Sequence, residues 1–207
     1  MKLTVTQRRP AVVPIQKVSA EVKKIHEIYL KHWLNEALQL EIKLDSSLKF
    51  VFEISEATNI PKSSITMLKG GLPFLSTETE GSFESKKFET QSIIDKSVFC
   101  VSKFEDRIKG KKTEVEVGEL IIRTTPVDYK RQIIIENKNG YDIFLKLVIT
   151  ETPDLKITEI SPGPKTQEAA DYIYELTILG NGKSKILMTL HTQEEERIKK
   201  EPKTKEK

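Results

Sequence analysis

The stretch that decides the fold is IYLKHWLNEALQLEIKLDSSLKFVFEI, residues 28–54. In its three segments 28–34, 38–44 and 48–54, apolar side chains occupy the even positions, whereas the odd positions are mostly charged or polar. Alternation with a period of two is typical of a β-strand that buries one face. The even positions are Ile28, Leu30, His32, Leu34, Leu38, Leu40, Ile42, Leu44, Leu48, Phe50, Phe52 and Ile54, of which only His32 is polar.

Short polar loops fit between these segments. Asn-Glu-Ala at 35–37 and Asp-Ser-Ser at 45–47 preserve the parity of the pattern. They would place Leu34 opposite Leu38 and leave all the apolar side chains on one face. We therefore predict an antiparallel meander of three strands, whose apolar face a second layer of structure covers.

Residues 20–36 also admit a helical interpretation. The segment is rich in Ala, Leu, Glu and Lys, and Val22, Ile25, Tyr29 and Trp33 are spaced like one face of a helix. We favour strands because the period of two explains more of the stretch, and the helix stands as the alternative.

Later segments read as short strands separated by turns. SITMLKGGLPFL, residues 64–75, predicts two strands joined by a Gly-Gly turn, followed by a polar connection through residue 92. KSVFCVSKF (96–104) and TEVEVGELIIRT (113–124) flank a Lys/Gly-rich turn, so we expect them to pair as a hairpin.

The segment RQIIIENKNGYDIFLKLVIT, residues 131–150, contains the turn dipeptide Asn139-Gly140. A three-residue hairpin loop would place Ile135 opposite Ile143, whereas an arch would carry the chain to a facing sheet. Both alternatives stand, and both direct the odd-numbered apolar side chains inward.

A domain organisation follows from these segments. The last strands, around Gly-Asn-Gly at 180–182, alternate in the same way, so residues 126–192 predict a small immunoglobulin-like unit. TTPVD marks its boundary with an antiparallel β unit at residues 1–125, and the charged tail 193–207 is expected to be disordered. The expected fold class is mainly β: an antiparallel β-sandwich with an N-terminal meander sheet and a C-terminal immunoglobulin-like sandwich.

Composition bounds the possible partners and compartment. Lys and Arg total 34 against 31 Asp and Glu, a formal net charge of +3 that is too even to imply a polyanionic partner by itself. The single cysteine forms no internal disulfide. No signal-peptide pattern and no run of about 18 apolar residues is present, so we predict a cytoplasmic protein without membrane insertion. Abundant Lys, Glu and Ile point to a thermophilic source.

The sequence predicts no catalytic residue, no cofactor site and no metal site. His32 lies on the apolar face of the predicted meander, where we expect a hydrogen-bonded core histidine. Cys100 sits in an apolar strand, which predicts a buried and unreactive thiol. His26 and His191 have no partners at zinc-binding spacing.

One candidate interaction face emerges from the odd positions of the meander. Aromatic side chains interleaved with lysines can stack on and neutralise single-stranded nucleic acid. Acidic residues at Glu27, Glu41 and Glu53 on the same face weaken that interpretation. The candidate face consists of Tyr29, Lys31, Trp33, Lys43 and Lys49.

The order of segments resembles a known family. RRPAVVPI, a strand pair, SITMLKGGLPFLSTETEGSF, TEVEVGELIIRT, YKRQIIIENKNGYDIFLKLVI, ISPGP and YIYELTILGNGKSKILMTL follow one another as in the C-terminal half of the mucoidy-inhibitor-A-like family. The resemblance covers roughly residues 10–192. It implies a β-sandwich without known catalytic residues, and this chain lacks the upstream β region and coiled coil that members of that family carry.

We therefore expect a non-catalytic module that acts in protein interaction or as a structural part, with a partner chain or as a homo-oligomer. A nucleic-acid-binding module that uses the Trp33, Tyr29 and lysine face is the alternative.

Overall fold

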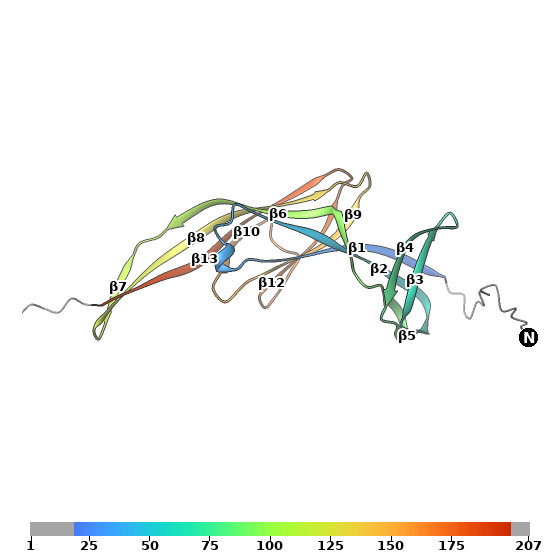
Figure 1. Cartoon of the computed structure of the whole chain (residues 1–207), viewed down its shortest axis with the longest axis horizontal. Coiled ribbons are helices and arrows are strands. Elements are labelled where there is room, and N and C mark those ends of the chain that lie inside the picture. The colour runs from blue at the N-terminus through green and yellow to red at the C-terminus, as the bar shows by residue number, and fades with distance from the viewer. Residues whose placement is uncertain (1–18, 200–207) are drawn as a thin grey trace, which may run out of the picture. The chain divides into compact units, whose positions relative to one another are not determined.

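The computed structural model of the chain describes residues 19–199 (Figure 1). Within that range the regular structure is β-strand except for one short 3-10 helix, η1 (Leu34–Glu36), so the chain is mainly β as predicted. The strands are β1 (Ala20–Lys31), β2 (Glu41–Ile60), β3 (Ser63–Lys69), β4 (Leu72–Thr79), β5 (Ser82–Glu89), β6 (Ile93–Lys109), β7 (Thr113–Val117), β8 (Leu120–Asn137), β9 (Ile143–Thr150), β10 (Lys156–Ser161), β11 (Thr166–Glu168), β12 (Asp171–Ile178) and β13 (Lys183–Lys199).

β1 is a strand, so the helical interpretation of this segment is wrong. Its side chains alternate as a half-buried strand requires: Ile28 and Leu30 are buried, whereas Tyr29 and Lys31 are exposed. The burial of alternate apolar side chains outweighs the helical propensity of the Ala, Glu and Lys residues.

The turn predicted at residues 45–47 does not form, because β2 runs through it as one strand. The pairing of β2 with β6 shifts register between Asp45 and Ser46, which is a β-bulge. The Ser46 hydroxyl donates a hydrogen bond to the Asp95 carbonyl oxygen at 3.2 Å. The Ser47 hydroxyl donates to the Glu27 carbonyl oxygen at 3.3 Å. These serines therefore bond to other strands rather than to their own backbone, and the strand continues.

The predicted meander of three strands is therefore two strands joined by the loop that contains η1. The predicted pairing of Leu34 with Leu38 is wrong, because Leu34 lies in η1 and both side chains are about half exposed. Leu40 is 78% exposed just before β2 begins. Leu34, Leu38 and Leu40 are thus exposed at the surface, although the pattern placed them on the buried face of a strand.

The described chain packs as two compact units, one made of residues 19–23 and Phe50–Gln91 and the other of residues 24–49 and 92–199. This division differs from the expected units at 1–125 and 126–192. The TTPVD segment at 124–128 lies inside the continuous strand β8.

The larger unit is built from one sheet with the strand order β10-β13-β8-β6-β2-β1-β9-β12-β11, with β7 added beside β8. β1 runs parallel to β9, whereas β9 with β12, and β8 with both β6 and β13, pair antiparallel. The sheet is therefore mixed. The immunoglobulin-like arrangement stays a prediction.

The core of the larger unit lies between the two ends of this sheet. Strands β8 and β13 are far from β9 and β12 in the strand order, yet their inward side chains belong to one buried cluster, so the sheet curls until its ends face each other. The odd-numbered apolar residues of β8 and β9 between 131 and 150 point inward as predicted, except for Tyr141, which lies between these strands and is 52% exposed. The cluster includes Ile28, Leu30, Tyr129, Ile133, Ile135, Leu145, Leu147, Ile149, Tyr172, Tyr174, Ile186, Met188 and Leu190.

An arch, not a hairpin, joins β8 to β9. β8 pairs with β6 and β13, whereas β9 pairs with β1 and β12. The buried Asn137 side-chain amide donates to the carbonyl oxygens of Tyr141 at 2.8 Å, Ile178 at 3.2 Å and Leu179 at 3.0 Å. Because Ile178 ends β12, this one side chain ties the β8–β9 arch to the arch that leads into β13.

Three further expectations are corrected. β6 pairs with β8 instead of β7, and TEVEVGELIIRT forms its own hairpin, with Val117 opposite Leu120. The predicted polar connection contains β5, which pairs with β2. The tail expected to be disordered from residue 193 continues β13 as far as Lys199, where it pairs with β8. The rest of that tail lies outside the described residues.

The smaller unit contains the predicted Gly-Gly hairpin as a sheet of β3 and β4. Lys69 pairs with Leu72, and Gly70 and Gly71 have φ values of 60° and 82°. Glycine adopts this left-handed backbone without the steric penalty that a Cβ atom brings, so the dipeptide closes the two-residue turn.

In the described part of the chain, no helix is long and apolar enough to cross a membrane.

Candidate interaction surfaces

The predicted interaction face begins at the exposed end of β1. Tyr29 is 61% exposed and Trp33 is 46% exposed. The Lys31 ammonium lies 4.4 Å from the centre of the Trp33 ring, a cation–π contact. These three residues occupy every second position of the chain and leave aromatic surface open to solvent.

The other two residues of that face are held by different groups. The Lys43 ammonium lies 4.4 Å from the centre of the Phe99 ring, on β6. The Lys49 ammonium forms a salt bridge with Glu27 at 3.0 Å. Their charges are thus already engaged, and less positive charge is open to a phosphate backbone than the sequence pattern indicates.

The loop after β1 is an ordered turn. Trp33 has extended backbone angles, and its carbonyl oxygen accepts a hydrogen bond from the Glu36 backbone N–H at 2.9 Å. The Glu36 carboxylate in turn accepts a hydrogen bond from the Trp33 backbone N–H at 3.4 Å, so the two residues close the turn on each other. Ala37 is completely buried behind them.

Arg131 anchors this loop from inside the protein. It is 1% exposed although it lies on β8 among apolar neighbours. Its guanidinium donates to the carbonyl oxygens of Ala37 at 2.9 Å, Gln39 at 3.1 Å and Ser102 at 2.9 Å, and to the Ser102 hydroxyl at 2.8 Å. Burial lowers the pKa of Arg131, and the nearby Glu36 carboxylate opposes that shift.

His32 completes the network around Arg131. Its Nε2 atom lies 2.8 Å from the Ser102 hydroxyl oxygen. That oxygen also accepts a hydrogen bond from Arg131, so the Ser102 hydroxyl links the His32 ring to the guanidinium. Burial, and then the Arg131 charge, lower the pKa of His32 to about 3, in agreement with a neutral ring. His32 is the hydrogen-bonded core histidine that the sequence predicted.

The loop outlines a shallow surface cavity, which we call the Trp33 hollow. It has a volume of about 610 Å³ and is lined by Trp33, Leu34, Asn35, Glu36 and Asp154. Neither Glu36 nor Asp154 forms a salt bridge with a lysine or arginine of the described chain. The hollow therefore combines an apolar wall with two carboxylates.

The tip of the β3–β4 hairpin is apolar, and we call residues 68–74 the hairpin tip. Leu68 is 58% exposed, Leu72 is 73% exposed and Phe74 is 51% exposed. Lys69 is the only charged residue between Ile65 and Thr77. Leu72 lies opposite Lys69 on one face of the hairpin, whereas Leu68, opposite Pro73, lies on the other face, so large apolar side chains are exposed on both faces beside a single positive charge.

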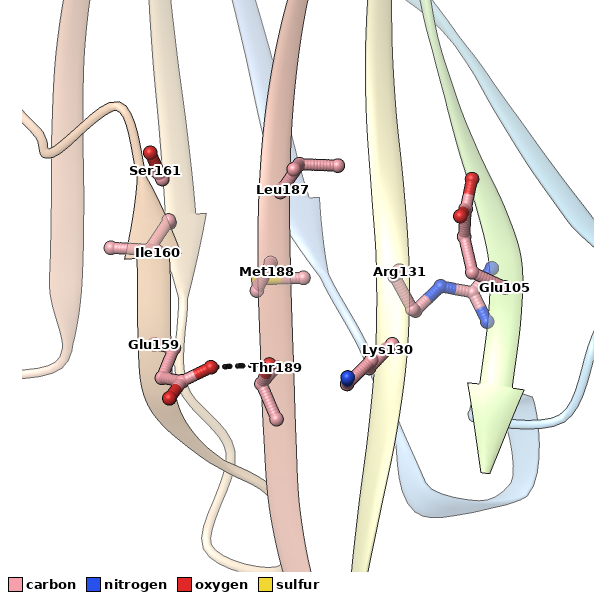
Figure 2. A pocket seen from close by; sticks show the side chains of 9 residues that line it. All are labelled: Glu105, Lys130, Arg131, Glu159, Ile160, Ser161, Leu187, Met188 and Thr189. Atoms are coloured by element: carbon pink, nitrogen blue, oxygen red, sulfur yellow. Dashed lines mark hydrogen bonds between the residues drawn. The ribbon is translucent and has the colours of Figure 1, made fainter. Parts of the chain in front are cut away.

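A second cavity, of about 310 Å³, lies over β8, β10 and β13 (Figure 2). The charged residues that line it are Lys130, Arg131, Glu105 and Glu159. The Thr189 hydroxyl donates to Glu159 at 3.3 Å, and the Gln132 amide donates to Glu105 at 2.7 Å. These carboxylates already have partners, so the cavity does not present convergent groups to a ligand.

His26, Ser46 and Asp95 form a buried polar cluster. The Ser46 hydroxyl lies 3.3 Å and the Asp95 carboxylate 3.6 Å from the same His26 atom, Nδ1. A serine–histidine–aspartate relay needs the serine and the carboxylate on different ring nitrogens. This arrangement therefore does not activate Ser46, and it holds the β2 bulge in place instead.

Cys100 is completely buried in β6, as predicted. Burial raises the pKa of its thiol to about 12. His191 pairs with Asp128 on the neighbouring strand, with Nδ1 2.7 Å from the carboxylate. Among the described residues, no group of histidine, cysteine and acidic side chains is arranged to hold a metal ion.

Comparison with known proteins adds little to this geometry. No protein-family model and no curated protein matches the chain. Among solved structures, the NMR structure of the folded domain of LppM from Mycobacterium tuberculosis aligns over 91% of this chain and 97% of that chain, with 8% sequence identity and a TM-score of 0.19. A TM-score this low supports no inference about fold or function. The resemblance to the mucoidy-inhibitor-A-like family stays a prediction.

Sequence reasoning did not single out Arg131 or the hairpin tip. Arg131 occupies an inward odd position between Tyr129 and Ile133, and a charged residue there signals a buried network. Leu72 and Phe74 follow the Gly-Gly turn directly, where large apolar side chains have few neighbours to cover them.

Proposed function

We propose that this chain is a non-catalytic protein-interaction module and that the hairpin tip is one of its contact surfaces. The observation that carries the proposal is the exposure of Leu68, Leu72 and Phe74, each more than half open to solvent. Covering them on a partner would contribute about 3–5 kcal/mol, since a fully buried side chain of this size is worth about 1.5–3 kcal/mol. Clustered apolar exposure of this kind is typical of contact surfaces.

The strand edges support the same proposal. Among the described residues β7 pairs only with β8, and all five of its side chains are exposed. An edge strand with open backbone groups can accept a further strand from a partner chain. A structural role in an assembly therefore fits the same surfaces.

Site-specific photo-crosslinking tests the proposal. A photoreactive phenylalanine analogue replaces Phe74 in the full chain, and the same analogue at Phe83 is the control. Phe83 is 77% exposed in the same unit, but it lies next to Ser82, which pairs with Ile60 near the hairpin base. The hairpin spans roughly 20 Å, at about 3.3 Å per residue, from Ser63 and Thr79 at its base to Lys69 and Leu72 at its tip. A probe at its base therefore lies far from the tip.

We expect protein adducts from position 74 in a lysate of the source cells, and markedly fewer from position 83. Equal or absent adducts at the two positions would overturn the proposal. The probe reports contact at the tip itself, and it detects either a second copy of the chain or another protein.

The exposure of Tyr29 and Trp33 favours one alternative, a module that binds single-stranded nucleic acid at that face. Trp33 is the only tryptophan of the chain, so its fluorescence reports stacking directly. The alternative predicts quenching by a single-stranded oligonucleotide that weakens steeply with salt. Unchanged Trp33 emission at low salt rules it out.

A further inference from the structure

We propose that the hairpin tip of one chain inserts into the Trp33 hollow of a second copy. The inference rests on the proposed function and names both the partner and its receiving surface. The tip is a feature of the smaller unit, whereas the hollow lies in the larger one. Each chain therefore carries both halves of the contact.

The hairpin tip has the shape and charge of an inserting group. Leu72 and Phe74 lie just after the glycine turn, and Lys69 lies directly opposite Leu72 across the hairpin. Lys69 has no salt bridge to a described residue. A two-stranded hairpin also contributes little buried surface by itself, so a receiving partner stabilises it.

The Trp33 hollow offers the complementary chemistry. The Trp33 ring and Leu34 supply an apolar surface, and Glu36 and Asp154 supply two carboxylates. Lys31 covers part of the Trp33 ring and the buried Arg131 guanidinium acts on Glu36, so Asp154 is the carboxylate of the hollow that best complements Lys69 of a second copy. Arg131 holds the loop that forms the hollow, so the surface is formed before the partner arrives.

A second copy accounts for more of the surface than other occupants do. A bilayer would accept Leu72 and Phe74 but leaves the Trp33 hollow without a role. A second copy covers both apolar surfaces at once and pairs Lys69 with Asp154 or Glu36. Because the two surfaces differ, the contact is heterologous and extends into rings or open chains of copies.

Sedimentation velocity of the full chain over micromolar to millimolar concentrations tests the inference, with Trp33 emission recorded in parallel. We expect weight-average mass to rise with concentration while Trp33 emission shifts to the blue. The tip variant Leu72→Ser/Phe74→Ser should weaken association by about 30-fold or more, because it removes most of the inserted apolar surface. The matched control Phe83→Ser, on an exposed residue of the same unit, should leave association unchanged.

Complementation between variants gives the sharper result. Leu34 and Asp154 are both exposed, so Leu34→Lys/Asp154→Lys removes apolar wall, repels Lys69 and disables the hollow without burying a new charge. Neither this hollow variant nor the tip variant should extend into assemblies alone. Mixed together they should form one-to-one dimers, because the hollow variant still has an intact tip and the tip variant still has an intact hollow. The absence of dimers in the mixture overturns the inference.

Charge reversal checks the pairing of Lys69. Lys69→Glu alone should weaken association by about threefold to tenfold, and Lys69→Glu together with Asp154→Lys should restore it. If the double variant does not restore association, and if Phe83→Ser weakens association as much as Lys69→Glu does, the contact is not specific.

The outcomes separate this inference from the proposed function. A chain that stays monomeric at all concentrations, while position 74 still crosslinks to another protein, overturns the inference and leaves the proposed function standing. A monomeric chain with no adducts at position 74 removes both. Binding of the tip to vesicles of anionic lipid, lost in Leu72→Ser/Phe74→Ser without any self-association, also overturns the inference.

Discussion

Replacing Arg131 with methionine should destabilise the protein and loosen the loop that carries Trp33. The substitution removes the donors to the carbonyl oxygens of Ala37, Gln39 and Ser102. Ala37 and Ser102 are completely buried, whereas Gln39 is exposed and regains water. Two buried carbonyl groups are thus left without their side-chain donor.

The magnitude follows from two opposing effects. Each buried acceptor left unsatisfied costs about 1–3 kcal/mol. Removing the guanidinium also relieves the cost of burying a charge, which is several kcal/mol before its hydrogen bonds are counted. Because methionine fills much of the same volume, cavity formation adds little. We expect Arg131→Met to lower the free energy of unfolding by about 2–4 kcal/mol.

Denaturant unfolding followed by circular dichroism measures this change, and acrylamide quenching of Trp33 in the native state reports the loop. Quenching should increase because Ala37 and Gln39 lose their anchor. Lys130→Met, at the exposed neighbouring position of β8, is the matched control and should change stability by less than about 0.5 kcal/mol. If Arg131→Met were as stable as the wild type and Trp33 quenching were unchanged, the reasoning about this network would be refuted.

Three further outcomes are expected. The folded-state pKa of His32, about 3, lies below its unfolded value of about 6.5, so the unfolded state binds the proton first and stability falls as pH falls from about 6.5 towards 3. Between pH 7.5 and pH 5 the wild type should lose about 2 kcal/mol more than His32→Gln, and equal losses in urea titrations would contradict this. Asn137→Ala should lower the free energy of unfolding by about 2–3 kcal/mol, because three carbonyl groups lose their donor. Asn139→Ala loses only the side-chain bond to Ser97 and should lower it by about 1 kcal/mol. Similar values for the two variants would contradict the role of Asn137 in joining the two arches. Cys100 should react with a thiol reagent only as fast as the protein unfolds, and rapid labelling of the native chain would disprove its burial.

Local periodicity predicted the elements whose burial is decided along one strand. The alternation around Ile28 and Leu30 identified β1, and the inward odd positions of β8 and β9 were correct before their partners were known. The Gly-Gly hairpin was also predicted, because the left-handed turn is a local property of Gly70 and Gly71.

Pairing between distant segments could not be predicted in the same way. The Asp-Ser-Ser segment has the composition of a turn, yet Ser46 and Ser47 bond across to Asp95 and Glu27. The acidic start of the expected tail is a strand because it pairs with residues 120–126 of β8, and Glu194 and Glu196 also form salt bridges with Lys109 and Lys112, which are remote in sequence. The Trp33 hollow depends on Arg131, nearly a hundred residues further along the chain.

The parallel pairing of β1 with β9 constrains the order in which the protein can fold during synthesis. His26 lies opposite Leu145 in that pair, so the ribosome must synthesise 119 further residues (145 minus 26) before β1 gains this neighbour. Until then the side chains of Ile28 and Leu30 remain exposed to solvent, where chaperones can bind them. β13 follows later still and pairs along its whole length with β8, so the larger unit is complete only after this strand has emerged.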